Sequence, residues 1–204
     1  PNGAGKSTML GLTSGMLEPT NGWAFIGGHP AGTIEARAAL SYLPDSPVLY
    51  DDLSLGEHVE YVARLHQTQD WEEYADDLIE MFGLTDRIDD LPSRFSRGLK
   101  QKTGLILGLI RPFRVMLVDE PFVGLDTPGQ ETLVEIPYSR IRRHKGYAAP
   151  NQHGFSVIVA PLLAQEVSNN ITKPPTIAPR SRAAGPRWGR LRSRVRSYNC
   201  GLRD

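Results

Sequence analysis

The sequence predicts an α/β fold in which a mostly parallel, buried central sheet carries flanking helices and a helical insertion. Three observations lead to this prediction. A glycine-rich segment at residues 1–8 precedes a helical apolar pattern, residues 115–118 are continuously apolar, and residues 53–82 contain two amphipathic helical repeats. A continuous apolar run is typical of a strand that is buried on both faces, as parallel strands are. The 204 residues are enough for one domain with a substantial core.

The net charge of zero hides an uneven distribution along the chain. Residues 171–204 hold nine Lys and Arg against one acid, whereas residues 1–170 hold 14 against 22. Prolines alternate with arginines in the last segment without a helical or strand period, so we expect a disordered basic tail there and the folded domain at residues 1–170. The single cysteine, Cys200, excludes an intrachain disulfide, and no apolar run reaches the roughly 18 residues of a membrane span.

Residues Pro1–Thr8 read PNGAGKST, which is a phosphate-binding loop without its first glycine. The pattern needs that glycine and a strand before it, so we expect the sequence to be a fragment truncated at its N-terminus. The glycines let backbone N–H groups turn towards phosphate oxygens, Lys6 adds a charge for the β- and γ-phosphates, and the Ser7 hydroxyl can ligate Mg²⁺. The residues predicted to bind a nucleotide are Asn2, Gly3, Ala4, Gly5, Lys6, Ser7 and Thr8.

Two acids follow the predicted strand at residues 115–118. Asp119 would face the phosphate-binding loop and hold the Mg²⁺ shell, and Glu120 is placed to orient or deprotonate an attacking water. A third segment begins at Ser96, which is a natural N-cap for a helix that continues to Ile110. The start of that helix offers free N–H donors to an anion.

Together these motifs resemble the ATP-binding cassette (ABC) ATPase family over roughly residues 1–135. Residues 1–8 resemble Walker A, and residues 115–120 resemble Walker B with its catalytic glutamate. Residues 95–101 resemble the ABC signature in a diverged form, whose basic third residue is most similar to the bacterial drug-, antibiotic- and polysaccharide-exporter branch. The resemblance implies a signature that contacts ATP held by a second copy, made by Ser96, Arg97, Gly98, Leu99, Lys100 and Gln101. It also implies a D-loop made by Gly124, Leu125 and Asp126.

The resemblance implies a P-loop NTPase fold and an ATPase that uses ATP and Mg²⁺. A homodimer or pseudo-dimer would sandwich ATP between Lys6 of one copy and Ser96 and Gly98 of the other. The dimer would sit at the cytoplasmic face of the plasma membrane and power export by a separate integral membrane permease, which would contact a helical subdomain at about residues 46–110. No nucleic-acid partner is expected. Two alternatives stay open: a soluble ABC ATPase that acts on ribosomes or DNA, and a catalytically dead nucleotide-binding fragment.

Two positions depart from the family. Asp45 stands where the family usually has a glutamine, and its carboxylate can still coordinate Mg²⁺. Pro161 stands where a strand would end in the histidine that contacts the γ-phosphate, and His153 precedes that strand instead. We therefore expect no competent switch histidine. After Glu135, Pro137 interrupts the expected helix, and residues 136–204 are explained by a reading-frame error, a genuine tail or a folded accessory domain.

Overall fold

The computed structural model describes residues 5–120, 122–135 and 156–159, and its centre is a parallel sheet. The strands lie in the order β3 (Leu40–Leu43), β4 (Val115–Val118) and β5 (Ser156–Val159). Leu40 is opposite Val115, and Val115 is opposite Ser156. Residues 116–118 of the middle strand are all buried, which confirms the continuous apolar run as a strand covered on both faces.

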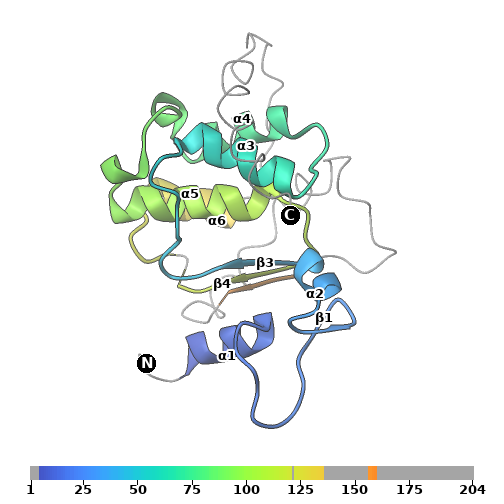
Figure 1. Cartoon of the computed structure of the whole chain (residues 1–204). Coiled ribbons are helices and arrows are strands. Elements are labelled where there is room, and N and C mark those ends of the chain that lie inside the picture. Colours follow the sequence, from blue (N-terminus) through green and yellow to red (C-terminus); the bar gives the residue numbers. More distant parts are fainter. Residues whose placement is uncertain (1–4, 121, 136–155, 160–204) are drawn as a thin grey trace.

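Helices cover both faces of this sheet (Figure 1). Helix α1 lies on one face; α5 and α6 lie on the other, with α3 and α4 beyond α5. Helix α2 leads directly into β3. The bounds of the helices are α1 (Lys6–Ser14), α2 (Ile34–Ala39), α3 (Leu55–Leu65), α4 (Trp71–Met81), α5 (Arg97–Ile110) and α6 (Thr127–Glu135), with short 3-10 turns η1 (Thr85–Arg87) and η2 (Pro92–Arg94) before α5.

A short hairpin beside α2 joins β1 (Phe25–Ile26) to β2 (His29–Pro30). The sequence predicts a strand from Trp23, but only two residues of each strand pair. The reason is local: the turn at Gly27 and Gly28 closes the ladder at once, and Pro30 has no N–H to extend it.

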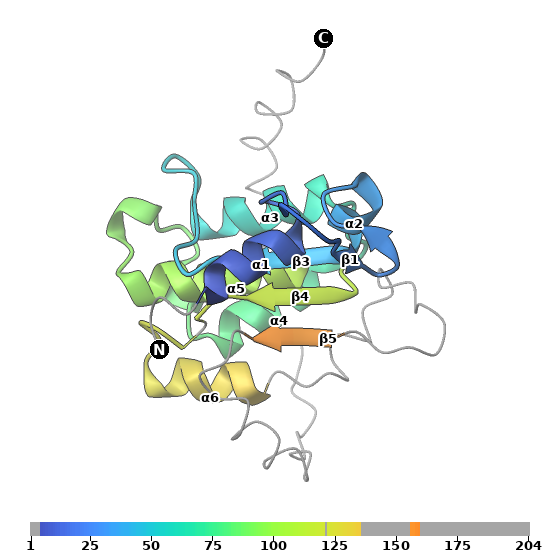
Figure 2. The same cartoon turned by 90° about the horizontal axis from the view of Figure 1, so that it is seen from below.

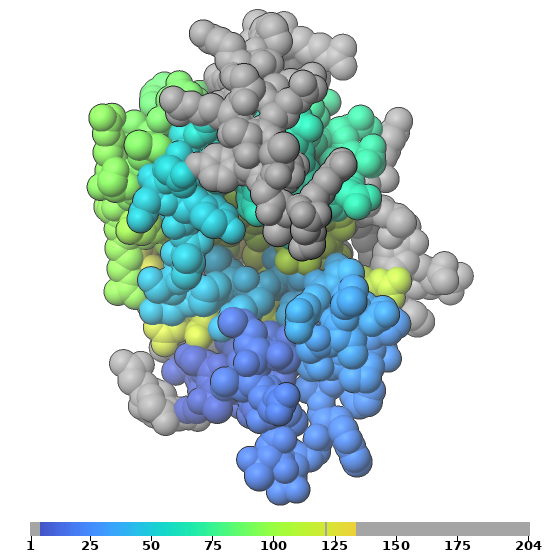
Figure 3. All heavy atoms as spheres, viewed as in Figure 1, coloured from blue at the N-terminus to red at the C-terminus, as the bar shows by residue number. Residues whose placement is uncertain are grey.

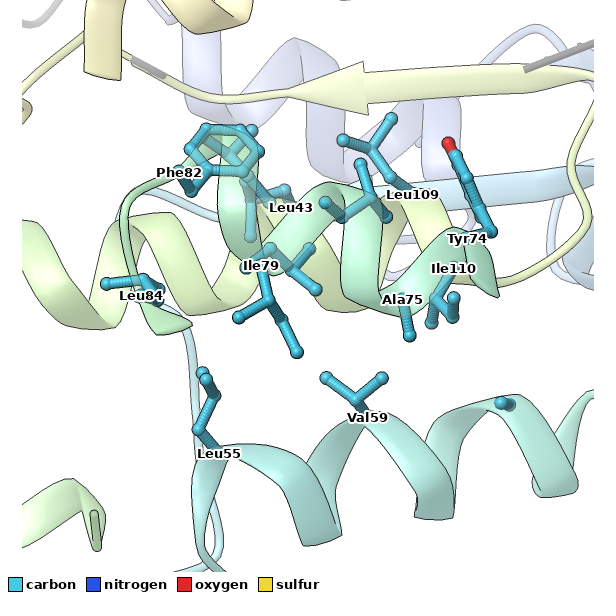
Figure 4. Close-up of a cluster of buried hydrophobic side chains, with 14 of the residues drawn as sticks. Leu43, Leu55, Val59, Tyr74, Ala75, Ile79, Phe82, Leu84, Leu109 and Ile110 are labelled. Atoms are coloured by element: carbon cyan, nitrogen blue, oxygen red, sulfur yellow. The ribbon is translucent and has the colours of Figure 1, made fainter. Parts of the chain in front are cut away.

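The helices between β3 and β4 enclose the larger apolar core (Figure 4). Helix α3 begins with a capping box, because the Ser54 hydroxyl accepts from the Glu57 N–H and the Glu57 carboxylate accepts from the Ser54 N–H. The Ser-x-x-Glu spacing of Ser54 and Glu57 in the sequence predicts this capping box, and the structure confirms it. Val59 of α3 and Ile79 of α4 are both fully buried and lie on facing sides of the cluster in Figure 4. The insertion is therefore a packed unit continuous with the upper face of the sheet.

A smaller apolar cluster lies on the α1 face of the sheet. Its buried members are Leu10, Ile26, Ala36, Leu40 and Leu117. In the space-filling view, the blue N-terminal segments form a lobe below the cyan and green helical region (Figure 3). None of the helices in the described ranges has the length and apolar composition that a membrane span requires.

Several sequence predictions fall outside the described residues. These are the roles of Asn2, Gly3 and Ala4, the positions of His153 and Pro161, and the basic tail at residues 171–204. The strand expected at residues 155–159 is present as β5, and helix α6 ends at Glu135, directly before the Ile136–Pro137 pair.

Candidate functional site

The candidate site lies at the edge of the sheet where its strands end. The carboxyl ends of β3 and β4 and the amino-terminal end of α1 meet at this edge (Figure 2). Ligands of open parallel sheets bind in this position, because loops from several strands converge there. The described part of the predicted phosphate-binding loop, residues 5–8, and the two predicted acids are therefore on the same side of the molecule.

Gly5 gives the chain the turn that starts α1. Its φ of 81° and ψ of 13° lie in the left-handed region, which favours glycine because other residues carry a Cβ. Its carbonyl oxygen accepts from the Met9 N–H at 2.8 Å, so the helix begins directly after the turn. No side chain caps this helix start, and Ser7 and Thr8 are exposed there. The first turn of α1 thus keeps N–H donors that suit an anion.

Lys6 and Glu120 come together across this edge. The Lys6 Nζ lies 4.0 Å from the Glu120 Oε1, and the side chains are 16% and 27% exposed. The lysine follows the loop before α1, and the glutamate follows β4, so the contact joins segments far apart in the sequence. The Lys6 ammonium group and the Glu120 carboxylate, which can accept a proton, therefore lie close together in a partly buried site.

The backbone at Glu120 is unusual. Its φ of 48° places a residue with a side chain in the left-handed region, where a cost of about 1 kcal/mol or more is expected. The Val123 N–H donates to the Glu120 carbonyl oxygen at 3.1 Å and closes the turn that follows. Such strained backbone conformations often occur at functional sites, so this one agrees with the role predicted for Glu120.

Asp119 is the buried partner of this pair of acids. Its side chain is 3% exposed, and its N–H donates to the Leu43 carbonyl oxygen at 2.9 Å, which fixes it beside β3. The Asp119 Oδ1 has no hydrogen-bond partner within the described part of the chain. A buried carboxylate oxygen without a donor is costly unless a cation meets it. Together with the Ser7 hydroxyl, these oxygens are the ligand type that Mg²⁺ prefers, so the residues fit this metal.

The Tyr42 hydroxyl of β3 is influenced by the same buried acid, Asp119. Burial raises the pKa of its hydroxyl, and the nearby Asp119 carboxylate adds to this effect. Both causes favour the neutral phenol, since a second negative charge beside Asp119 would be unfavourable. The phenol was not among the residues predicted for the site.

Asp45 and Arg97 form an ion pair that the sequence did not predict. The Arg97 Nη2 donates to the Asp45 Oδ1 at 2.9 Å, with side chains 63% and 43% exposed. Asp45 lies in the loop after β3, and Arg97 is the first residue of α5. The sequence predicted Asp45 as a ligand of Mg²⁺ and Arg97 as a contact of ATP held by a second copy; in this structure the two side chains contact each other.

The predicted signature segment forms the start of α5. The Ser96 hydroxyl accepts from the Leu99 N–H at 3.2 Å, which confirms Ser96 as the N-cap. Ser96, Arg97 and Lys100 are exposed, whereas Leu99 packs against the core and Gln101 is 1% exposed. The exposed face of the segment therefore consists of the cap, the arginine and the lysine.

The predicted D-loop packs on this helix start. A Cβ added to Gly98 would clash with the Gly124 carbonyl oxygen, so only glycine permits this approach. Leu125 is buried in the core, and the Lys102 Nζ lies 2.9 Å from the Asp126 Oδ1. The hydrogen bond from Lys102 is the main cause of the lowered pKa of Asp126. Sequence reasoning missed Lys102; its spacing of one helical turn from Gly98 was the available signal.

The parallel sheet, the glycine turn before α1 and the acids after β4 define a P-loop NTPase fold. The chain belongs to the ABC transporter family, whose sequence pattern matches residues 1–123. It is 33% identical over 135 residues to the SkfA peptide export ATP-binding protein SkfE of Bacillus subtilis (strain 168), a match over 65% of this chain and 56% of that protein. It is also 33% identical over 141 residues to the ABC-type transporter ATP-binding protein EcsA of the same organism, over 66% and 56% of the two chains.

Solved structures agree with this assignment. One, described as the structure of the ATP binding subunit of an ABC transporter, is 30% identical with a TM-score of 0.66, over 80% of this chain and 66% of that one. A putative ABC transporter ATP-binding protein from Pyrococcus furiosus is 21% identical with a TM-score of 0.60, over 78% and 74%, and supports the fold alone. The chain spans 56% of the length of each of the two Bacillus relatives.

Proposed function

We propose that this chain is the ATP-binding and ATP-hydrolysing subunit of an ABC transporter. One observation carries the proposal. The Lys6 Nζ and the Glu120 Oε1 lie 4.0 Å apart at the sheet edge, beside the buried Asp119. Phosphoryl transfer needs a cation for the phosphates, an acceptor that orients water and a carboxylate for the metal, and these three residues supply them.

Each residue has a distinct task in this proposal. Lys6 and the N–H groups at the start of α1 bind the phosphates of ATP. Glu120 orients the attacking water and accepts its proton. Asp119 and Ser7 would hold Mg²⁺, and the metal would supply charge to offset the phosphate oxygens. Lys6 contacts Glu120 in this structure. A phosphate group of ATP must therefore displace the Glu120 carboxylate from Lys6 before Glu120 can orient the attacking water.

The family supports the assembly we propose around this site. A second copy would present its signature segment, residues 96–101, to the ATP bound at Lys6. An integral membrane permease would receive the resulting motion, which places the subunit at the cytoplasmic face of the plasma membrane. Export is the direction we propose, because the relative SkfE is named for peptide export. No nucleic acid is part of this proposal.

Measurements of ATP binding and of ATP turnover on the purified chain test the proposal. Lys6→Ala should abolish binding, because it removes the charge for the phosphates. Glu120→Gln should keep binding while turnover falls by about 10²-fold or more, since the amide cannot accept the proton. Glu131→Gln, on the exposed surface of α6, is the matched control. Near-normal turnover in Glu120→Gln would refute the assignment of the base.

The partner subunit needs a separate experiment. Where a neighbouring gene encodes a multispanning membrane protein, co-expression of that protein with this chain should give a complex that survives purification. Binding of the chain to ribosomes or DNA, with no such complex, would instead support the soluble class of ABC ATPases.

A further inference from the structure

We infer that Arg97 is a positioning residue that links two loops of its own copy, and that Asp45 acts as its partner and not as a ligand of Mg²⁺. The inference rests on the proposed function, because it concerns the loops of that ATP site. It starts from the ion pair between the Arg97 Nη2 and the Asp45 Oδ1 at 2.9 Å. This contact joins the loop after β3 to the first residue of α5.

The stem of Arg97 contacts the other loop. A Cβ built on Gly124 would lie 3.4 Å from the Arg97 Cγ and 3.6 Å from its Cδ. The aliphatic part of the side chain therefore runs along the D-loop while its guanidinium reaches Asp45. A single side chain thus contacts the D-loop with its carbon atoms and the loop after β3 with its charge.

Both loops have further anchors on α5. The D-loop approaches Gly98, and its Asp126 pairs with Lys102 one turn later. The loop after β3 packs at Gly104, where a Cβ would lie 2.6 Å from the Pro47 Cγ. The first two turns of α5 therefore form the base on which both loops rest. Arg97 lies at the open end of this base, where it is the side chain that bridges from one loop to the other.

This arrangement gives Asp45 and Arg97 a different role from the one that the sequence predicted for each. The Asp45 Oδ1 accepts from the guanidinium, so a divalent cation would meet only the other carboxylate oxygen and would be repelled by the nearby positive charge. The guanidinium is directed at its own copy, so the exposed Ser96 and the N–H groups of α5 are left to face the ATP of a second copy. The ion pair therefore explains both why Arg97 stands in the signature and why Asp45 stands in place of the family's glutamine.

The first test measures hydrogen exchange of backbone amides in the nucleotide-free protein. Asp45→Asn and Arg97→Gln should each speed exchange in residues 44–50 and 122–126 by about two- to fivefold, the range expected for one exposed ion pair. The double reversal Asp45→Arg with Arg97→Asp should restore the original rates, and an acid is well tolerated in the first turn of a helix. Arg94→Gln, which removes another exposed arginine close to α5, is the matched control.

The second test measures the Mg²⁺ concentration that supports half-maximal ATP binding. If Arg97 positions the loops, Asp45→Asn and Arg97→Gln should change this concentration to the same extent, and the double reversal should return it to the starting value. If Asp45 is a metal ligand, Asp45→Asn should raise it several-fold, Arg97→Gln should not, and the reversal should fail to restore it. That pattern, or unchanged exchange in Arg97→Gln, would overturn the inference.

The two tests also separate this inference from the proposed function. The exchange experiment needs no nucleotide, so its result decides the role of the ion pair even if the chain does not bind ATP. Loss of ATP binding in the unaltered chain would instead count against the proposed function alone.

Discussion

The two faces of the sheet are built differently. The face under α3, α4 and α5 buries a large apolar cluster, in which Val59, Ile79 and Leu105 are completely covered. The face under α1 buries a small cluster, and the hairpin beside it leaves Trp23 89% exposed. Burial of apolar area provides most of the free energy of folding. The comparison therefore assigns stability mainly to the helical face, whereas the α1 face carries the turn that is predicted to bind phosphate.

The polar groups at the sheet edge differ from those at the start of α3. The capping box of Ser54 and Glu57 satisfies its buried polar groups locally. At the sheet edge, Asp119 keeps one oxygen without a partner in the described ranges, and Glu120 has a strained backbone. Local strain and incomplete hydrogen bonding are tolerated where a ligand will meet them. Stability and ligand binding are thus carried by different segments of one fold.

The largest expected effect compares one buried aliphatic side chain from each face. Ile79→Ala should lower the free energy of unfolding by about 3–5 kcal/mol, because it opens a cavity in a fully enclosed position. Leu10→Ala should cost about 2 kcal/mol, because its small cluster can relax around the smaller side chain. Denaturant unfolding of both variants measures the difference. An equal or larger loss in Leu10→Ala would contradict the division between the faces.

A smaller effect is expected from the helix caps. Ser54→Ala should cost about 1–2 kcal/mol, since it breaks a buried capping box at the start of α3. Thr33→Ala should cost about 0.5 kcal/mol, because its cap of α2 is only partly buried and its hydroxyl accepts from the Ala36 N–H at 3.3 Å. The same unfolding assay reports both values. A larger loss of unfolding free energy in Thr33→Ala than in Ser54→Ala would show that the α1 face contributes more to stability than its burial indicates.

The smallest effect concerns the pH dependence of stability. Burial, and then the charge of Arg111, lowers the pKa of His66 from 6.5 to about 4. The unfolded chain therefore binds a proton between these values that the folded chain does not, so stability falls as pH decreases from 6.5 towards 4. His66→Gln should reduce this loss. Unfolding curves from pH 7.5 to 4.5 test it, with the exposed His29→Gln as the control.

An identical pH dependence in His66→Gln and in the unaltered chain would show that His66 is not responsible for the loss. His58 behaves similarly through a different environment. Its Nε2 accepts from the Tyr50 N–H at 2.9 Å, so its Nδ1 carries the proton and donates to the Ser54 carbonyl oxygen. Burial is the main cause of its lowered pKa, which adds to the acid sensitivity of the helical region.

Local features of the fold were predictable from the sequence. The capping box at Ser54, the N-cap at Ser96, and the buried strand at residues 115–118 depend on neighbouring residues, and all are present. Helix α2 and strand β3 were not predicted. The four residues of β3 carry no strong period, and they become a strand because β4 pairs with them. Such tertiary context overrides weak local preference.

The site was predictable only in part, for a similar reason. Lys6, Asp119 and Glu120 belong to short motifs, so the sequence identified them as candidate site residues. The structure brings the lysine and the glutamate together. The contact between Arg97 and Asp45 joins residues that are far apart in the sequence, so no local sequence pattern predicts it. The left-handed backbone of Glu120 was equally invisible, because sequence preference favours glycine in that conformation.

The order of strands has a consequence for how the chain acquires its structure. Strand β3 pairs with β4, yet all of α3, α4 and α5 lie between them in the sequence. During synthesis, β3 leaves the ribosome before β4, its neighbour in the described sheet, and the two strands can pair only after the helices between them have followed. Those helices make contacts between near neighbours in sequence, which form quickly, whereas distant parallel pairing is slow. We therefore expect the helical region to form before β4 pairs with β3, so that the sheet edge with Asp119 and Glu120 is completed late in folding.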